Sequence, residues 1–320
     1  MSLTPRQSDF DEARARIEGL VHRTPLFSSR ALSERSGLEV RLKAENLQKT
    51  GSFKPRGAFN KVLRLPPAER ERGIITASAG NNGQAVAFVA AHQGIPGYVV
   101  MPEGANRSKV AAVREYGAKA ILHGTLWDDA FAQSVEIAED KALSYVHPFK
   151  DRDIMAGQGT VALEILEDFP DVEAVLVPIG GGGLIGGMAT AFKSFKPEVQ
   201  VIGVEPEGAA NMAESHRAGR PVELDTVSTA ADGLATKKTD PEVWETIAAH
   251  VDAFVTVSDD QMMRAIAFLL ERAKLLTEVS GAATTAALLA GACELPPGTK
   301  TVAVLSGGNF DVGGKLELHT

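Results

Sequence analysis

A lysine at the expected start of a helix is the first residue of this sequence that suggests chemistry. Lys54 stands between Phe53 and Pro55 in KTGSFKPRGAFN, residues 49–60. Proline suits the first turn of a helix, and the residue before it is pushed out of the helical region, so Lys54 is predicted at the cap. The positive end of the helix dipole, together with Arg56, is expected to lower the pKa of the lysine amine. A Schiff-base lysine needs such an amine, whereas a lone lysine is more often a solvated surface group.

Four consecutive glycines, in IGGGGLIGG at residues 179–187, form a second unusual pattern. They follow the apolar run AVLVP and precede a helical pattern, so their N–H groups are expected to wrap around an anion at a helix start. Because such a run costs chain entropy, a phosphate cradle is favoured over a plain turn. Gly181, Gly183 and Gly186 also match GxGxxG. Glu205 then ends the next strand, so a dinucleotide-binding oxidoreductase is an alternative interpretation.

Two further loops follow predicted strands, where parallel sheets bind their ligands. ASAGNNGQA, residues 77–85, places Ser78, Asn81 and Asn82 at a helix start, which suits a carboxylate or phosphate but also an ordinary polar turn. The loop LSGGNFD places the neutral hydroxyl of Ser306 at a strand end. The seven histidines show no metal-ligand spacing and no GxSxG motif is present, so metalloprotease and serine hydrolase chemistry are not indicated.

Short apolar strands alternate with helical patterns along the chain, with glycine or proline at the joins. This alternation predicts an α/β fold of two open, mainly parallel twisted sheets flanked by helices. We expect a small domain at residues 71–147 and a large domain built from residues 1–70 and 148–320. The first helix is expected at residues 8–20, capped by Ser8 and Asp11. The other expected helices are residues 81–93, 108–118, 128–140 and 157–169, and the expected strands are residues 41–45, 73–78, 96–101, 119–124, 143–147, 174–179, 199–205 and 301–306.

The bulk composition narrows the possible partners and location. A chain of 320 residues with 44% hydrophobic and 23% charged residues is ordinary for a globular protein. Its net charge of −8 argues against nucleic acid or an anionic membrane as partner. Cys293, the single cysteine, fits a reducing compartment. The polar, acidic N-terminus is unlike a signal peptide, and no apolar run is long enough to cross a bilayer, so the prediction is a cytoplasmic protein.

The motifs SFKPRGA, SAGNNGQ, GGGGLIGG and LSGGN, in this order and at these spacings, resemble the fold-type II pyridoxal-phosphate enzymes. Within that group the sequence is most similar to the serine/threonine dehydratases and serine racemases. Shorter stretches agree, among them HRTPL, HPF, AGQGT and GVEP, and the resemblance runs from His22 to Asp311. It implies a fold like that of the tryptophan synthase β-subunit, an amino-acid substrate and a homodimer.

The resemblance also implies a role for each motif. Lys54 would carry pyridoxal 5′-phosphate, and Phe53 and Gly233 would lie on the two faces of its ring. Asn81 would bond the ring hydroxyl, and Ser306 the ring nitrogen. The implied cofactor-binding residues are Phe53, Lys54, Asn81, Gly180, Gly181, Gly182, Gly183, Gly233 and Ser306, and the implied substrate-binding residues are Ser78, Asn81 and Asn82.

The implied reaction is α,β-elimination of water from L-threonine or L-serine, giving 2-oxobutanoate or pyruvate and ammonia. Lys54 would be the catalytic base that removes the α-proton. A neutral hydroxyl at the ring nitrogen makes the cofactor a weaker electron sink, which favours prompt loss of a β-leaving group over transamination. A serine racemase or a hydroxyaspartate dehydratase of the same fold are the alternatives.

Three positions depart from the family pattern. Asn82 stands where relatives often have histidine, which leaves the preferred substrate open. Ala79 stands where serine racemases have the serine that serves the second face of the substrate, so little racemisation is expected. Glu205 and the Ala209 carbonyl match the metal site of the family, but Asn211 replaces an aspartate. The expected cation, Mg²⁺ or another divalent or monovalent ion, should therefore bind weakly.

Overall fold

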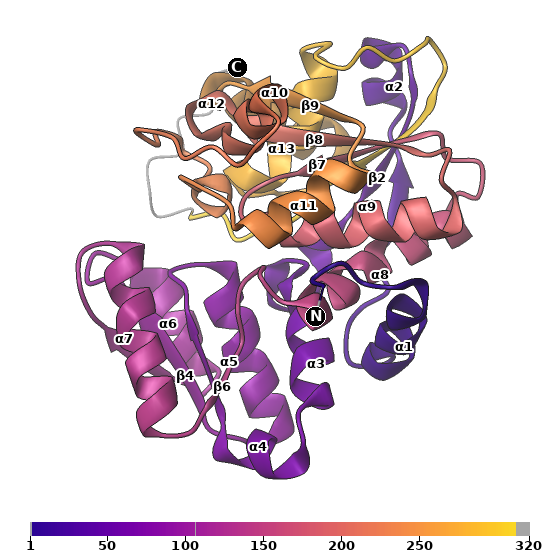
Figure 1. Cartoon of the computed structure of the whole chain (residues 1–320). Helices are drawn as coiled ribbons and strands as arrows, with labels where there is room; N and C mark the ends of the chain where they lie inside the picture. Colours follow the sequence, from indigo (N-terminus) through magenta and orange to yellow (C-terminus); the bar gives the residue numbers. More distant parts are fainter. Residues whose placement is uncertain (1, 106, 312–320) are drawn as a thin grey trace.

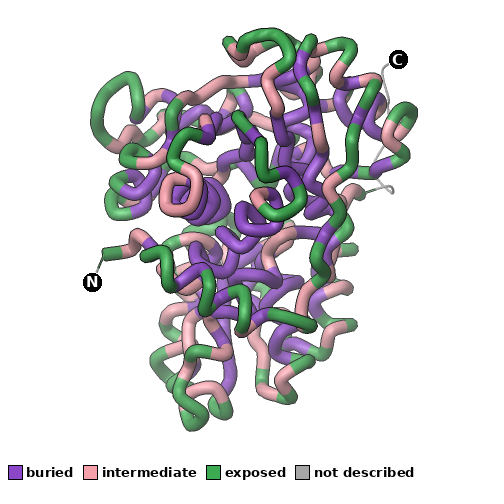
Figure 2. The backbone as a smooth tube through the Cα atoms, turned by 90° about the vertical axis from the view of Figure 1, so that its right-hand side faces the viewer, coloured by how far each residue is buried: buried purple, intermediate pink, exposed green. Residues whose placement is uncertain are grey.

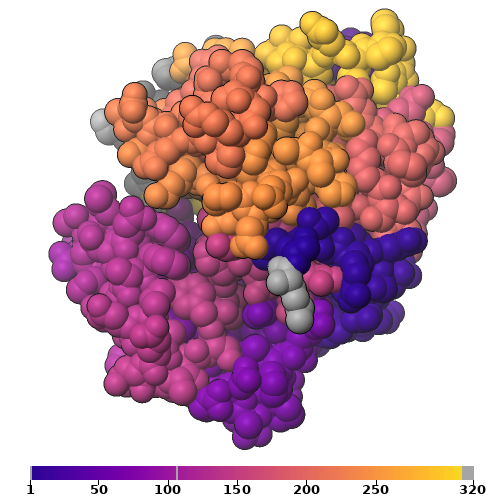
Figure 3. Space-filling view, viewed as in Figure 1, coloured from indigo at the N-terminus to yellow at the C-terminus, as the bar shows by residue number. Residues whose placement is uncertain are grey.

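The structure is a computed structural model and describes residues 2–105 and 107–311. Two lobes are visible, an upper one built on a six-stranded sheet and a lower one built on a four-stranded sheet (Figure 1). Helix α1 lies along the seam between the lobes and contacts α3, α8 and α9, so the first residues of the chain help to join the two parts (Figure 3). No helix among the described residues has both the length and the apolar character that a membrane span requires.

The six-stranded sheet has the order β1-β2-β10-β7-β8-β9, and only β1 pairs in the antiparallel sense. The four-stranded sheet has the order β5-β4-β3-β6 and is parallel throughout. The predicted pair of mainly parallel sheets is therefore confirmed. The strands are β1 (Leu26–Ser28), β2 (Glu39–Lys43), β3 (Ile74–Ala77), β4 (Gly97–Met101), β5 (Lys119–Leu122), β6 (Ser144–Tyr145), β7 (Ala174–Pro178), β8 (Gln200–Pro206), β9 (Ala253–Val257) and β10 (Lys300–Val304).

Helices cover the sheets, and short helical turns connect several of them. The longer helices are α1 (Gln7–Ile17), α2 (Arg30–Ser36), α3 (Lys54–Arg64), α4 (Pro67–Arg72), α5 (Asn81–Gln93), α6 (Arg107–Glu115), α7 (Trp127–Asp140), α8 (Arg152–Asp168), α9 (Gly183–Phe195), α10 (Asn211–Ala218), α11 (Pro241–His250), α12 (Asp259–Phe268) and α13 (Val279–Leu289). The turns are η1 (Glu45–Leu47), η2 (Lys49–Gly51), η3 (Glu207–Ala209), η4 (Asp232–Leu234) and η5 (Leu269–Ala273).

Both faces of the six-stranded sheet are buried, which explains why β7 reads as the unbroken apolar run AVLVP. Successive side chains of a strand point to opposite faces. Val175 and Val177 accordingly pack against α8, α9 and α11, whereas Leu176 packs with α2, α12 and α13. Buried residues fill the interior of the molecule, and exposed residues lie on the outer helices and loops (Figure 2).

The lower sheet is covered in the same way, by α5 and α6 on one face and by α7 on the other. Helix α3 joins this packing through Ala58, Phe59 and Val62, and it also contacts α8. The helix that begins at Lys54 is therefore held by both lobes. The domain limits at residues 71 and 147 stay a prediction.

All eight expected strands occur, with ends shifted by one or two residues, while β1 and β9 are not among the predicted strands. The predicted cap of the first helix is wrong. Helix α1 begins at Gln7, so Ser8 lies inside its first turn, and the carboxylate of Asp9 accepts the backbone N–H of Arg6 at 2.7 Å. The helix also ends earlier than predicted, at Ile17.

Candidate active site

Lys54 is the first residue of α3, with Phe53 as the N-cap in helical conformation and Pro55 as the second helical residue. The helix thus begins one residue before the predicted position. The Nζ of Lys54 donates a hydrogen bond of 2.8 Å to the carbonyl oxygen of Pro148 and lies 5.1 Å from the centre of the Phe53 ring. The amine therefore has a neutral acceptor and an aromatic neighbour rather than a paired carboxylate.

Burial lowers the pKa of the Lys54 amine to about 8, and the carboxylate of Glu278 acts in the opposite direction. The direction agrees with the prediction, but the predicted contribution of Arg56 is wrong. Arg56 is fully buried and paired with Glu45 at 2.8 Å and with Glu164 at 2.6 Å, so its charge is neutralised locally. A desolvated amine with a pKa near neutral pH can exchange its proton, as a catalytic base must.

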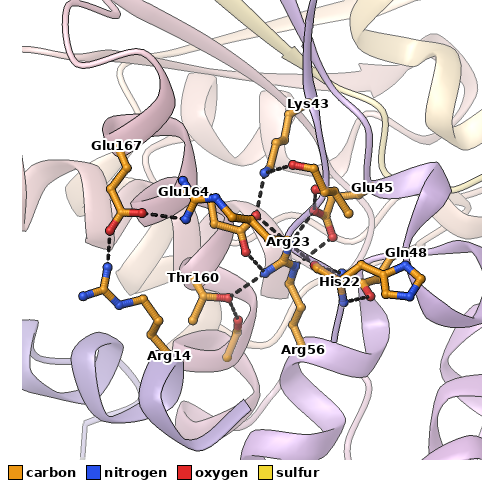
Figure 4. Close-up of polar contacts among 12 residues, drawn as sticks. Arg14, His22, Arg23, Lys43, Glu45, Gln48, Arg56, Thr160, Glu164 and Glu167 are labelled. Carbon is orange, nitrogen blue, oxygen red and sulfur yellow. Dashed lines mark hydrogen bonds and ion pairs between the residues drawn. The ribbon is translucent and has the colours of Figure 1, made fainter. Parts of the chain in front are cut away.

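Arg56 and its partners form a compact buried cluster (Figure 4). Lys43, which is also fully buried, lies 2.5 Å from Glu164 and donates to the carbonyl oxygen of Thr24. The charges of this cluster balance, because it contains two cations, Arg56 and Lys43, and two carboxylates, Glu45 and Glu164. Arg56 lies two residues after Lys54, so the cluster holds the first turn of α3. It therefore fixes the backbone position of Lys54.

The glycine run forms the turn into α9, as predicted. Gly183 is the first helical residue and Gly182 is the N-cap, with φ at +92°, a conformation that favours glycine. The first N–H groups of a helix have no acceptor within the helix and carry its partial positive charge. This turn therefore fits the phosphate of a cofactor.

Neighbouring segments pack so closely against the glycine run that side chains are excluded. A Cβ at Gly180 would lie 2.5 Å from the carbonyl oxygen of Gly233. A Cβ at Gly181 would collide with the ring of Phe149, the residue after the Pro148 carbonyl that binds Lys54. The predicted ring-face residue Gly233 thus contacts the glycine run directly, and Lys54 is linked to it through the Pro148–Phe149 segment.

Gln158 of α8 is a residue that the predicted site did not include. It is 1% exposed, and neither its Oε1 nor its Nε2 has a hydrogen-bond partner. Its Oε1 lies 2.8 Å from where a Cβ of Gly183 would stand, and its Nε2 lies 3.2 Å from the corresponding point at Gly57. A buried amide without partners is costly, so an unmet donor and acceptor beside the glycine run fit a site built for a polar group.

His147 fixes the segment that binds Lys54. Its Nδ1 accepts the backbone N–H groups of Phe149 at 3.2 Å and Lys150 at 2.8 Å. Burial, reinforced by the charge of Lys54, lowers the pKa of His147 to about 4, so the ring is neutral at physiological pH. A neutral imidazole can keep accepting these bonds, which holds the Pro148 carbonyl in place.

Asn81 and Ser306 come together through the loop after β10. The Oδ1 of Asn81 accepts a hydrogen bond of 2.8 Å from Nδ2 of Asn309, three residues after Ser306. The carbonyl oxygen of Ser306 accepts the N–H of Phe53 at 3.2 Å. The structure therefore brings Ser306 next to the start of α3 and Asn81 next to the Ser306 loop.

The predicted substrate-binding residues Ser78 and Asn82 form the turn from β3 into α5. The Oγ of Ser78 accepts the backbone N–H of Gly80 at 3.1 Å, which leaves its hydroxyl free to donate. Asn82 is 5% exposed, and its Nδ2 donates to the hydroxyl of Thr76 at 2.9 Å. One N–H of Asn82 remains, so both side chains keep a donor for a carboxylate.

The predicted cation residues lie around the start of α10. Both carboxylate oxygens of the fully buried Glu205 accept backbone N–H groups, from Met212 at 2.9 Å and Ala213 at 2.7 Å. Burial raises the pKa of Glu205 to about 7. Asn211 donates to Thr236, and its Oδ1 is buried without a partner. Among the described residues, no group of three or more His, Cys, Asp or Glu side chains is arranged to hold a metal.

These contacts also bear on the dinucleotide alternative. A ribose-binding acid needs a carboxylate that is open to a ligand, whereas Glu205 is used to cap α10. Gly186, the third glycine of the GxGxxG match, lies inside α9. The match arose because four adjacent glycines satisfy the pattern easily.

Comparison with known proteins gives a consistent result. Residues 17–307 match the family described as "Pyridoxal-phosphate dependent enzyme". The chain is 47% identical over 304 residues to the L-threonine ammonia-lyase of Thermotoga maritima, covering 95% of this chain and 75% of that protein. It is 44% identical over 305 residues to the catabolic L-threonine dehydratase of Escherichia coli strain K12, covering 95% and 93%. A maize serine racemase structure has a TM-score of 0.94 and 35% identity, covering 97% and 95%.

Proposed function

Because the chain belongs to the family of pyridoxal-phosphate-dependent enzymes, we propose that it eliminates water from L-threonine and L-serine. The products are 2-oxobutanoate or pyruvate, together with ammonia. One observation carries the proposal: the low-pKa amine of Lys54 is joined, through the Pro148–Phe149 segment, to a glycine turn that excludes side chains.

The residues present fit pyridoxal phosphate. Bound there, the cofactor supplies the electron sink that makes the α-proton of an amino acid acidic. The N–H groups from Gly180 to Gly183 would hold the phosphate, and Phe53 and Gly233 would lie against the ring. Asn81 would donate a hydrogen bond to the ring oxygen, and Ser306 would bond the ring nitrogen. The unpartnered Gln158 beside this turn supports a polar occupant.

Lys54 has two tasks in this proposal, to anchor the cofactor and to take the α-proton on Nζ. The lowered pKa leaves a usable fraction of neutral amine near pH 7. The side chains of Ser78 and Asn82, with the backbone N–H of Asn81, orient the substrate carboxylate from the start of α5, where the helix dipole also favours negative charge. A cytoplasmic location and a homodimer complete the proposal, and light scattering of the purified protein tests the dimer.

The product mixture tests the function. Purified protein loaded with pyridoxal phosphate is expected to form 2-oxobutanoate from L-threonine and pyruvate from L-serine, with one ammonia for each. In competition, 3-hydroxyaspartate should have a lower specificity constant, because Asp128 and Asp129 in the first turn of α7 would repel a second substrate carboxylate. A higher constant for 3-hydroxyaspartate would assign the chain to that dehydratase activity instead.

Racemisation is the second candidate function, since a maize serine racemase shares the fold. It needs a proton donor on each face of the substrate, and Lys54 serves only one. The methyl group of Ala79 cannot carry a proton, and the adjacent Ser78 hydroxyl, which accepts the N–H of Gly80, is assigned to the substrate carboxylate. We therefore expect D-serine to form at least about tenfold more slowly than pyruvate.

Chiral chromatography of an L-serine digest measures both products. Ala79→Ser should raise the ratio of D-serine to pyruvate, whereas Ala79→Gly, the matched control, should not. D-serine formed as fast as pyruvate by the unaltered protein would overturn the assignment.

We propose a weak cation site at Glu205, the Ala209 carbonyl and Asn211. The partnerless Oδ1 of Asn211 and the buried carboxylate of Glu205, whose described partners are backbone N–H groups, support it. Asn211→Asp restores a second carboxylate, so the melting temperature of this variant should depend on millimolar Mg²⁺ more than that of the unaltered protein does. Thermal unfolding with Mg²⁺ and with a chelator checks this. Equal Mg²⁺ dependence of the two proteins would argue against the site.

A further inference from the structure

Glu278, in the turn before α13, is a half-buried glutamate that the roles described so far do not use. Its Oε1 accepts a hydrogen bond of 2.6 Å from Nδ2 of Asn81. Its backbone N–H donates to the carbonyl oxygen of Gly307 at 3.1 Å. No cation of the described residues lies within ion-pair distance of its carboxylate. Burying a carboxylate without a paired cation costs stability, so the presence of this one indicates a role other than stabilising the fold.

The contacts of Asn81 indicate that role. Its side-chain amide is bound at both ends, by the acceptor Glu278 at Nδ2 and by the donor Asn309 at Oδ1. If the amide were flipped, its N–H groups would face the donor Asn309 and its oxygen would face the carboxylate. Only one orientation satisfies both neighbours, and in that orientation the second N–H of Nδ2 stays available.

The backbone leaves room for this arrangement. A side chain at Gly307 would collide with Oε1 of Glu278 and would lie 3.2 Å from Nδ2 of Asn81. Gly307 also forms an antiparallel bridge with Ser52, two residues before Lys54. Gly307, which leaves space for the Glu278 side chain, therefore pairs directly with the segment that precedes Lys54.

We propose that Glu278 is a positioning residue: it holds the Asn81 amide so that one N–H is kept for the cofactor's ring oxygen, and it places a negative charge beside Lys54. The inference rests on the proposed elimination reaction. Burial, with a smaller contribution from the charge of Asp232, raises the pKa of Glu278 to about 7, and the Asn81 hydrogen bond and the charges of Lys109 and Lys54 limit this rise.

Two substitutions separate the hydrogen bond from the charge. Glu278→Ala removes both, whereas Glu278→Gln keeps an acceptor for Asn81 and removes only the charge. Glu271→Gln, at an exposed position seven residues earlier, is the matched control for loss of a carboxylate. Each variant is studied as holoenzyme, with the cofactor content, the visible absorbance band as a function of pH, and kcat and KM for L-threonine all measured.

Glu278→Ala is expected to retain the cofactor, because Lys54 and the glycine turn are intact. Its kcat should fall about 10- to 100-fold while KM changes less than about threefold. Glu278→Gln should recover most of the turnover, and in both variants the pH midpoint of the absorbance band should move down, because the carboxylate that favours a protonated neighbour is gone. Gly307→Ala should resemble Glu278→Ala.

Three results would overturn the proposal: a kcat and pH midpoint of Glu278→Ala within about twofold and about 0.2 pH units of the unaltered enzyme, equal impairment of the Gln and Ala variants, or outright loss of the cofactor. A failure of the proposed reaction looks different. The unaltered enzyme would then not turn over L-threonine, while the absorbance shift of the Glu278 variants would still report the loss of the negative charge beside Lys54.

Discussion

Replacing Lys54 with alanine is expected to lower the turnover of L-threonine by at least about 10³-fold while the protein stays folded. The same amine anchors the cofactor and takes the α-proton, so both tasks fail together. Folding should survive because the Nζ makes only one described hydrogen bond, to the Pro148 carbonyl, and no described ion pair. Steady-state assays of 2-oxobutanoate measure the loss, and circular dichroism measures the fold.

Lys119→Ala, at an exposed position on β5, is the control for loss of a lysine and should keep full activity. The mechanism cannot stand if Lys54→Ala turns over L-threonine within about tenfold of the unaltered enzyme. Partial recovery of the variant by added primary amines would be additional support, because a soluble amine can replace the missing base.

Replacing Arg56 with alanine is expected to cost about 3–5 kcal/mol of unfolding free energy. The substitution leaves Glu45 and Glu164 buried with Lys43 as the one remaining cation of the cluster (Figure 4). Removing one partner of a buried ion pair is costly because the other partner cannot regain water. Urea unfolding followed by fluorescence or circular dichroism gives the difference.

Arg30→Ala is the matched control, since Arg30 pairs with Glu34 at 2.7 Å on an exposed helix face, where solvent screens the interaction. Its unfolding midpoint should be unchanged within error. If Arg56→Ala also left the unfolding midpoint unchanged, the cluster would not be holding the start of α3. The fixed backbone position of Lys54 would then need another explanation.

Local chemistry made the glycine turn and the strand ends predictable. Four glycines before a helix have few structural uses, and the strands are short apolar runs with clear boundaries. Strand β1 was not predicted because it has only three residues, two of them exposed. Strand β9 was also missed, although its sequence AFVTV has the β-branched residues typical of a strand and could have been identified.

The residues that escaped prediction acquire their roles only through tertiary contacts. Gln158 belongs to α8, yet its side-chain amide lies against Gly183 at the start of α9. Glu278 likewise meets Asn81 across 197 residues of sequence. No local pattern marks such pairs, because each contact exists only once the sheets are assembled.

The pKa of Lys54 also depends on tertiary contacts that the sequence does not show. Arg56 stands two residues away in the sequence, so its charge was predicted to act on the lysine amine. In the fold, Glu45 and Glu164 neutralise that charge, and burial lowers the pKa instead. The direction was predictable from one segment, but the cause depended in part on Glu164, which is 108 residues from Arg56.

Reductive trapping of the holoenzyme tests the central claim most directly. Borohydride reduces the bond between a lysine amine and bound pyridoxal phosphate to a stable secondary amine, and peptide mass spectrometry then locates the label. We predict bleaching of the visible absorbance and one label per chain, on Lys54, with none on the Lys54→Ala variant. A label on another lysine, or no label on a protein that turns over L-threonine, would contradict this claim.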